Sequence, residues 1–177
     1  MSWANEFVEL DKQIHDRNSF DCGEDELNGF IKTRAAKHMV AGVSRTMVRP
    51  AISPLPDGKY PICSFYSIAP SQIERQTLPA ALAKTLPHYL IPVFLIAQLA
   101  VHADIKGRGF GKITLIKALE HLWSVNAQMR AYAVVVDCLN RAAQDFYTRF
   151  GFEKLTQVNG RVRLFMPMNT VGQLFED

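Results

Sequence analysis

A glycine-rich loop near the middle of the sequence has the clearest potential for chemistry. Gly107, Gly109 and Gly111 alternate with other residues between an apolar run, which predicts a buried strand, and the predicted start of a helix. The backbone N–H groups of such a loop can converge on an anion, and the missing side chains let phosphate oxygens approach. The loop also carries three cations, Lys106, Arg108 and Lys112. It therefore predicts a phosphate or diphosphate site, with a plain turn as the alternative, because turns also use glycine for positive φ angles.

Two well-known nucleotide-binding loops do not fit this segment. A P-loop has the pattern GxxxxGK[ST], whereas here Gly111-Lys112 is followed by Ile113 and Lys106 stands where the first glycine is needed. A dinucleotide-binding loop has the pattern GxGxxG and opens a βαβ unit, whereas this loop reads GxGxG and follows many earlier elements. The sequence therefore favours neither a P-loop nucleotidase nor a dinucleotide-dependent enzyme.

Four other side chains could take part in chemistry, and each has a structural alternative. A phenol with a pKa near 10, such as Tyr147, can supply a proton without being deprotonated at rest. Neighbouring phenylalanines favour a packing role for the same ring when the context is taken alone. His88 and His102 could act as bases, but a lone histidine near an apolar strand is more often structural. Cys22 is expected to be a small buried residue and not a nucleophile.

A mixed α/β arrangement must position these residues. The predicted strands cover residues 6–14, 43–49, 60–68, 90–101 and 132–139, and the Asn159-Gly160 pair predicts a late hairpin. The predicted helices cover residues 26–40, 110–128 and 140–151. Strand, glycine loop and helix thus follow in direct succession. We expect an α/β (α+β) fold with a mixed central β-sheet flanked by helices, as one domain over residues 1–177.

Apolar spacing indicates which helix faces are buried. The stripe expected on the first helix consists of Leu27, Phe30, Ile31 and Met39. The stripe expected on the helix after the glycine loop consists of Ile113, Ile116, Leu119, Leu122 and Trp123. Residues at such helical spacing pack against a sheet. The segment 53–59, SPLPDGK, is expected to be the turn between two neighbouring strands.

The loop and its flanks resemble the GNAT family of N-acetyltransferases. Residues 106–111 are similar to the family's Q/R-x-x-G-x-G/A signature, whose loop binds the pyrophosphate of acetyl-coenzyme A. Lys106 departs from that signature, because Gln or Arg is usual there. The resemblance continues with Leu-Ala-Val at 99–101 and with 134–152, which is similar to the family's strand, Asn-x-x-Ala, Phe-Tyr and Gly-Phe ending.

The resemblance is strongest to the acetyltransferase toxins of bacterial type II toxin–antitoxin pairs. Its motifs lie in residues 18–30, 91–111, 146–152 and 164–174, so the resemblance extends from one end of the chain nearly to the other. Two further departures are visible on the strand before the glycine loop. Gln98 stands where these toxins usually have Arg, and His102 stands where Asp is common.

The family resemblance implies roles for particular residues. Acetyl-coenzyme A would be the cosubstrate, with no metal, and its implied contacts are Leu99, Ala100, Val101, Lys106, Gly107, Arg108, Gly109, Phe110, Gly111, Lys112 and Asn140. The backbone of 99–101 would pair with the pantetheine arm, and the Val101 N–H would point at the thioester carbonyl. Tyr147 takes the position of the general acid. Asn140 has an alternative role as a helix cap.

No carboxylate stands out as a general base. An α-amine has a pKa near 8, and an aminoacyl ester lowers it further, so a substantial fraction is neutral at cellular pH. A lysine amine near 10.4 would need a base, so the sequence mildly favours an α-amine acceptor. Residues 27–56 contain no acid and carry five cations, Lys32, Arg34, Lys37, Arg45 and Arg49. They indicate a tRNA-binding face, or simply a solvated helix face.

The implied function is an N-acetyltransferase toxin that blocks translation by acetylating the α-amine of aminoacyl-tRNA. The resemblance also implies a ribbon-helix-helix antitoxin, contact with operator DNA only through a repressor complex with that antitoxin, and a homodimer. One alternative is an acetyltransferase for a small-molecule or protein amine. Another is a non-catalytic co-repressor module, which the intact glycine loop and Tyr147 disfavour.

Composition excludes several other classes. A chain of 177 residues with 48% hydrophobic and 21% charged residues is typical of one globular domain, and the net charge of +3 permits anionic partners without demanding them. Three widely spaced cysteines predict neither a disulfide framework nor a zinc site. The acidic start and the interrupted apolar runs predict a cytoplasmic protein without a leader or membrane span.

Overall fold

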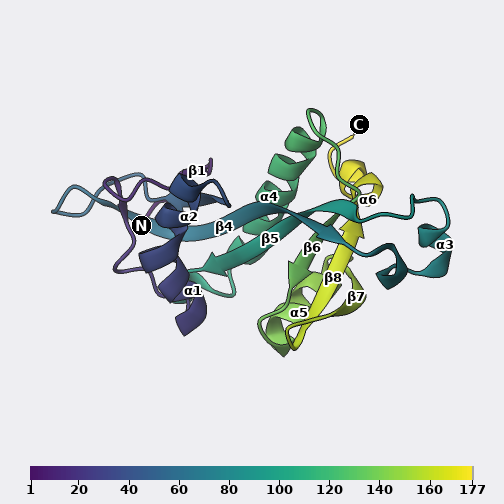
Figure 1. The fold of residues 1–177 in the computed structure, drawn as a ribbon. Helices are drawn as coiled ribbons and strands as arrows, with labels where there is room; N and C mark the ends of the chain where they lie inside the picture. The colour runs from purple at the N-terminus through teal and green to yellow at the C-terminus, as the bar shows by residue number, and fades with distance from the viewer. Residues whose placement is uncertain (177) are drawn as a thin grey trace. The chain divides into compact units, whose positions relative to one another are not determined.

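The structure, a computed structural model, describes residues 1–176, which form two compact units (Figure 1). The first unit consists of Met1–Ala69 and Ala97–Ala118. The second consists of Pro70–Ile96 and the chain from Leu119 onward. Each unit is therefore built from two separate stretches of sequence. Strands β4 (Tyr60–Ile73) and β5 (Ile91–Val101) and helix α4 (Phe110–Asn126) contribute residues to both.

Short strands flank β4 in the first unit. They are β1 (Val8–Glu9), β2 (His15–Asp16) and β3 (Arg45–Pro50). Strand β3 pairs antiparallel with both β1 and β4, and β2 pairs parallel with β4. The long strand predicted for residues 6–14 is wrong, because the chain turns at Asp11. The carboxylate of Asp11 accepts the Gln13 N–H at 2.9 Å, and its carbonyl accepts the His15 N–H at 2.8 Å.

The predicted first helix forms as three consecutive pieces. These are α1 (Asp25–Gly29), the π-helical turn η1 (Phe30–Arg34) and α2 (Ala35–Ala41), which ends at Gly42 with φ +78°. Phe30 and Ile31 are buried against the sheet, and Leu27 and Met39 pack beside them, so the predicted stripe is confirmed. The predicted turn at 53–59 also forms, with the Leu55 N–H donating to the Lys59 carbonyl at 2.8 Å.

The segment around the glycine loop follows the predicted order, strand, loop and helix. Strand β5 is followed by the 3-10 turn η3 (Ala103–Ile105), the glycine loop and α4. The stripe expected on α4 is partly wrong, since Ile113 is 40% exposed while Leu115 and Ala118 are fully buried. Apolar residues on this helix are numerous enough that sequence spacing alone fits more than one face.

The second unit contains a mixed sheet and the remaining helices. Its further elements are η2 (Arg75–Thr77), α3 (Ala80–Ala83), β6 (Ala133–Asp137), α5 (Arg141–Arg149), β7 (Glu153–Val158), β8 (Arg161–Pro167) and α6 (Met168–Gln173). Strands β5 and β6 pair parallel, whereas β8 pairs antiparallel with β6 and β7. This combination confirms the predicted mixed α/β class.

Two parts of the second unit differ from the sequence prediction. Between the predicted strands at 60–68 and 90–101, where the sequence indicated no element, the chain contains the end of β4 together with η2 and α3, and the Arg75 Nε donates to the Ala83 carbonyl at 2.8 Å. Helix α6 was not predicted; its Gly172 lies against the Trp123 ring, where an added Cβ would come within 2.5 Å. The predicted hairpin forms, with positive φ at Asn159 and Gly160.

Candidate functional site

The glycine loop has the geometry that its sequence predicts for an anion site. Gly107 and Gly109 adopt φ +80° and +82°, which L side chains rarely adopt, and both lie exposed. A Cβ built at either residue would meet no atom within 4 Å, so the space beside the loop is open. Helix α4 begins directly at Phe110, and the first N–H groups of a helix have no intrahelical acceptor. Loop and helix start together suit a diphosphate.

The strand that leads to the loop is fixed by packing. Ala100 is buried in the core formed with the first helix, and Val101 packs with Cys63 and Ile105. Leu99 is half-buried. The backbone of 99–101 is thereby held in extended form next to the loop, as a pairing edge for an extended ligand requires.

The loop cations differ in their surroundings. Arg108 and Lys112 are exposed, whereas the ammonium of Lys106 donates to the backbone carbonyl of Cys22. Cys22 itself is buried, and burial raises the pKa of its thiol, as expected for a structural cysteine. The nearby His102 accepts the Asp104 N–H on its Nδ1 at 3.2 Å and so caps η3. Of the two roles considered for His102, base or structural residue, the structure therefore supports the structural one.

Tyr147 belongs to the second unit, where it lies on α5 and is 7% exposed. Its ring makes edge contacts with Phe146 at 5.2 Å and Phe152 at 5.4 Å between ring centroids. Burial, followed by the nearby Cys138 thiol, raises the pKa of the Tyr147 phenol well above its ordinary value. The phenol therefore keeps its proton at neutral pH. The predicted packing contacts are present, and they hold the hydroxyl in one place.

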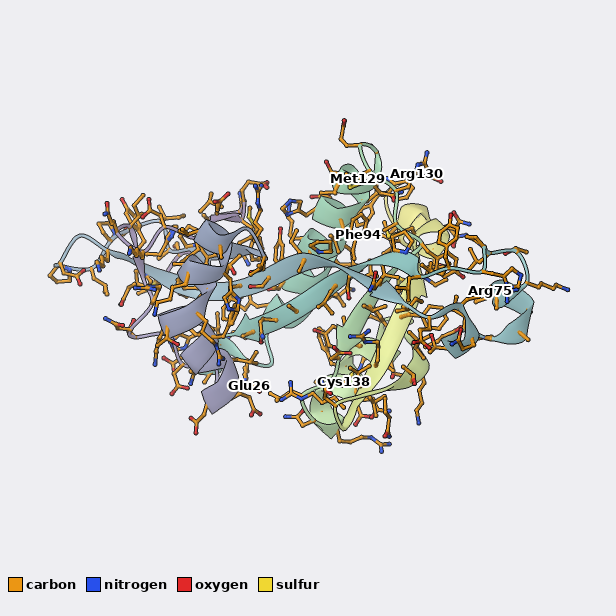
Figure 2. All side chains as sticks on the ribbon, viewed as in Figure 1. Glu26, Arg75, Phe94, Met129, Arg130 and Cys138 are labelled. Atoms are coloured by element: carbon orange, nitrogen blue, oxygen red, sulfur yellow. The ribbon has the colours of Figure 1, made fainter. Side chains whose placement is uncertain are left out.

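Asn140 and Cys138 lie just before the same helix. The Asn140 Oδ1 accepts the Ala143 N–H at 2.9 Å, so its capping alternative is observed. Cys138 follows β6 (Figure 2), and burial and then Asp137 raise the pKa of its thiol to about 11. Asp137 forms a bidentate pair with Arg163, with N–O distances of 2.6 and 2.8 Å. This pair, which the sequence analysis did not identify, links β6 to β8 shortly before α5, the helix that Asn140 caps and that carries Tyr147.

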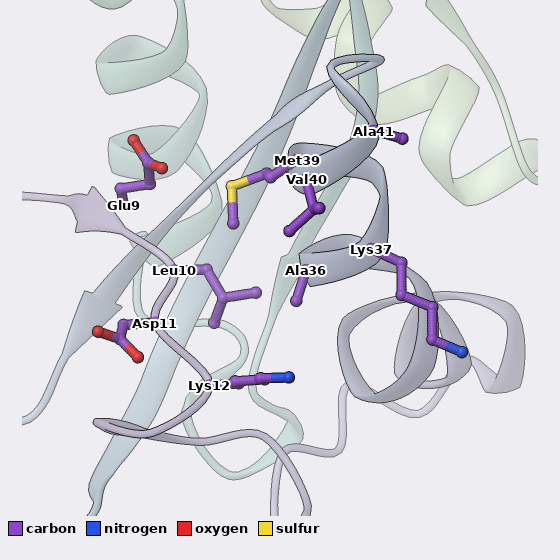
Figure 3. Close-up of a pocket in the computed structure, with 9 residues that line it drawn as sticks. All are labelled: Glu9, Leu10, Asp11, Lys12, Ala36, Lys37, Met39, Val40 and Ala41. Carbon is purple, nitrogen blue, oxygen red and sulfur yellow. The ribbon is translucent and has the colours of Figure 1, made fainter.

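Cations gather in a groove of the first unit. Its volume is about 280 Å³, and its described lining consists of Lys12, Arg17, Lys32, Thr33, Ala36 and Lys37, without a carboxylate. Figure 3 shows the adjoining pocket, where Lys12 from the N-terminal segment and Lys37 from α2 again contribute. Lys32 and Lys37 were predicted for an anion-binding face. Lys12 and Arg17 were missed because Asp11 and Asp16 directly precede them and cancel their charge in the sequence.

The other three predicted cations do not line this groove. Arg34 lies 5.8 Å from the Phe30 ring and donates to the Glu26 carbonyl (Glu26 is labelled in Figure 2). Arg45 is exposed, with Glu9 at 3.7 Å. Arg49 is only half-exposed, because its Nε donates to the Ala4 carbonyl at 2.6 Å and its guanidinium lies over the Phe110 ring. Arg49 thus braces the N-terminal segment against α4.

Comparison with known proteins identifies the family. Residues 80–152 match the model described as Acetyltransferase (GNAT) family. A curated protein, the tRNA-acetylating toxin of Mycobacterium tuberculosis, is 30% identical over 138 residues, which make up 78% of this chain and 78% of that protein. The chain belongs to the GNAT family. It is an acetyl-CoA-dependent N-acetyltransferase, homologous to tRNA-acetylating toxins of toxin–antitoxin systems.

Solved structures support the same GNAT fold over nearly the whole chain. A tyrosine-to-phenylalanine mutant of KacT superposes with a TM-score of 0.88 at 25% identity, covering 99% of this chain and 100% of that one. AtaT complexed with acetyl-methionyl-tRNAfMet gives a TM-score of 0.85 at 26% identity, covering 97% and 99%. The predicted fold, family and coenzyme are therefore confirmed.

Residues 1–176 lack two further kinds of feature. No helix in this part of the chain is long and apolar enough to cross a membrane. No group of three or more His, Cys, Asp or Glu side chains among these residues is arranged to hold a metal ion.

Proposed function

We propose that this GNAT enzyme acetylates the α-amine of the amino acid carried by tRNA, and that it acts as the toxin of a toxin–antitoxin pair. The observation that carries the proposal is the 30% identity, over 78% of the chain, to a tRNA-acetylating toxin. The neighbour AtaT, solved with an acetylated methionyl-tRNA, supports it over 97% of the chain. Acetylation removes the nucleophile of peptide-bond formation, so translation would stop.

Acetyl-CoA supplies an acetyl group activated as a thioester. The open space beside Gly107 and Gly109 and the start of α4 fit its diphosphate, and Arg108 and Lys112 add positive charge at the same loop. The extended backbone at 99–101 would align the pantetheine arm, and the Val101 N–H would stabilise negative charge on the carbonyl oxygen. These contacts use the main chain, which the packing of Ala100 and Val101 holds in place.

Tyr147 would act as the general acid. Its hydroxyl would donate a proton to the sulfur that departs when the amine attacks the thioester carbonyl. The raised pKa of the phenol keeps that proton available across the whole neutral range. On the acceptor side, an aminoacyl ester amine is largely neutral near pH 7.5, so water can accept its proton without a dedicated base.

The cationic groove would bind phosphates of the acceptor RNA. Lys12, Arg17, Lys32 and Lys37 line it, and the phosphate backbone supplies most of the affinity in protein–nucleic-acid complexes. Arg34 and Arg45 would contribute from its surroundings. Because tRNA is the substrate, the enzyme would act in the cytoplasm.

The proposed partners complete the toxin–antitoxin assignment. A ribbon-helix-helix antitoxin would neutralise the enzyme, and the pair would reach operator DNA only through the antitoxin. A homodimer is the oligomeric state that the family resemblance implies.

Labelled acetyl-CoA tests this proposal directly. Charged total tRNA is incubated with the enzyme, and label is measured in the tRNA fraction before and after mild alkali, which cleaves aminoacyl esters. The proposal expects alkali-releasable label as N-acetyl amino acid, and the amino acid found gives the specificity. Label only on free amines or proteins would replace this proposal with the alternative acceptor classes.

A further inference from the structure

The turn Asp21–Gly23, hereafter the DCG turn, is attached to the segment that leads into the glycine loop. The Asp21 carbonyl accepts the Ala103 N–H at 2.8 Å, and the ring of the preceding Phe20 packs edge-on against His102 at 5.6 Å. The Lys106 ammonium donates to the carbonyl of Cys22. Three successive residues of the N-terminal part thus contact three positions within residues 102–106.

The same turn is attached to the first helix on its other side. Asn28 of α1 accepts the Cys22 N–H on its Oδ1 at 2.9 Å and donates from its Nδ2 to the Asp21 carboxylate at 2.9 Å. That carboxylate also accepts the Gly23 N–H at 2.8 Å. Hydrogen bonds from Gly23 and then Asn28 hold the pKa of Asp21 below its usual value, so the network stays ionised at neutral pH.

Gly23 makes the close approach of Lys106 to this turn understandable. It adopts φ +86°, which the turn requires, and a Cβ built on it would lie 3.7 Å from the Lys106 Nζ. The ammonium therefore sits directly over the turn. A lysine is a compact charge on a long stem and suits one carbonyl, whereas a planar guanidinium suits two oxygens of a diphosphate. Lysine at this position, where Gln or Arg is usual in the family, fits the carbonyl.

We propose that Lys106 is a positioning residue that fastens the glycine loop to the DCG turn, and through Asn28 to the helix that carries the cationic groove. Loss of this side chain would weaken binding of the RNA acceptor more than binding of acetyl-CoA. The inference rests on the proposed function, because it assigns the acceptor to the groove lined by Lys32 and Lys37. The continuous path of contacts is Lys106, the Cys22 carbonyl, Asn28 and then the turn η1.

Separate KM values distinguish this role from direct binding of the coenzyme. Lys106→Met keeps the length of the side chain and removes its charge; Lys112→Met, in the first turn of α4 directly after the loop, is the matched control. For Lys106→Met we expect the KM for aminoacyl-tRNA to rise about tenfold, since a charge-assisted hydrogen bond is lost, with the KM for acetyl-CoA within about twofold of wild type. Lys112→Met should instead raise the KM for acetyl-CoA and leave the KM for aminoacyl-tRNA nearly unchanged. A rise confined to acetyl-CoA for Lys106→Met would overturn the proposal.

A double-mutant cycle tests the proposed path. Asn28→Ala should raise the KM for aminoacyl-tRNA as Lys106→Met does, and the combined variant should be little worse than either alone. Additive effects would mean that the two residues act independently, and the proposal would fail. Lys106→Arg keeps a charged donor with a head group that fits one carbonyl less well, so it should recover only part of the lost acceptor affinity.

Hydrogen exchange supplies a readout that does not depend on the acceptor. Lys106→Met should increase amide exchange in residues 21–34 relative to wild type and to Lys112→Met. Unchanged exchange there would overturn the positioning role even if the enzyme uses another amine. Absence of acetyl transfer from wild type to aminoacyl-tRNA, with increased exchange in Lys106→Met, would instead reject the proposed substrate and keep the attachment.

Discussion

The glycine loop of the first unit and Tyr147 of the second are opposite kinds of candidate functional element. The loop is exposed, would act through backbone groups in the proposed function, and has φ angles that only glycine adopts without strain. Tyr147 is buried, would act through one hydroxyl in the proposed function, and is positioned by edge contacts with the rings of Phe146 and Phe152. A backbone site tolerates changes in its side chains, whereas a single buried hydroxyl has no substitute. Mutations should therefore affect the two elements through different kinetic parameters.

Removing the Tyr147 hydroxyl should have the largest effect. In Tyr147→Phe the ring packing remains and only the proton donor is lost, so we expect kcat to fall about 100- to 1,000-fold with little change in KM for acetyl-CoA. Steady-state kinetics on charged tRNA would measure it. The control is Tyr132→Phe, a second tyrosine of the same unit whose pKa is also raised by burial. Equal toxicity of Tyr147→Phe and wild type in growing cells would argue against a chemical role.

A change of backbone freedom in the loop should act on binding. Gly109→Ala forces an alanine to φ +82° although its Cβ meets no neighbour, so we expect KM for acetyl-CoA to rise about tenfold through distortion of the anion site. Gly58→Ala is the matched control, since Gly58 has φ +85° and similarly open surroundings in the turn at 53–59. Both variants should lose about 1–2 kcal/mol of unfolding free energy. Equal KM values would show that the loop geometry does not serve the coenzyme.

Cations of the groove should have intermediate effects that depend on salt. Arg17→Ala and Lys37→Ala should each raise the KM for aminoacyl-tRNA about three- to fivefold and reduce the salt dependence of binding by about one counterion. Arg130→Ala, on an exposed cation of the second unit (Figure 2), is the control. KM for aminoacyl-tRNA, measured at several salt concentrations, distinguishes the groove variants from the control. If all three variants had the same KM and the same salt dependence, the groove would be an ordinary solvated surface that does not bind RNA.

The smallest effect concerns the stability of the first unit in mild acid. His15 is 4% exposed and its Nδ1 accepts the Asp11 N–H at 3.0 Å; burial lowers its pKa below 6.5. Unfolded chains then bind more protons than folded ones, so stability should decrease as the pH falls below about 6.5. Melting temperatures at pH 7.5 and 5.5 should differ less in His15→Asn, which keeps an acceptor and cannot be protonated. If the melting temperatures of wild type and His15→Asn changed equally between the two pH values, groups other than His15 would cause the acid sensitivity.

The sequence predicted elements whose signals are local. The φ-positive glycines at 107 and 109, the Asn159-Gly160 hairpin and the strand–loop–helix order around 90–128 follow from residue type and neighbours. The predicted strand at 6–14 failed because the Asp11 carboxylate captures the Gln13 N–H, an alternative to sheet pairing that a hydrophobicity pattern does not register. The burial of Leu115 in place of Ile113 depends on what α4 packs against.

Site residues from distant segments were hardest to predict. Lys12 and Arg17 join Lys32 and Lys37 only after the N-terminal segment has folded beside α2. The attachment of Lys106 to Cys22 joins residues 84 positions apart, which no motif spacing encodes. Conversely, Arg49 belonged to a run of cations in the sequence, but its stacking on Phe110 gives it a bracing role.

The π-helical turn at Phe30–Arg34 determines which charges of the first helix can act together. Residues five apart on a regular α-helix are rotated by about 140°, so their side chains diverge. A π turn holds more residues, which brings Lys32 and Lys37 to the same groove. Converting this turn to a regular α-helix without changing the five-residue spacing of the two lysines would leave every charge in the chain and still move them to different faces. In relatives with an ordinary α-helical turn here, equivalent cations should be spaced three or four residues apart, so helix register, more than charge number, is the trait to compare.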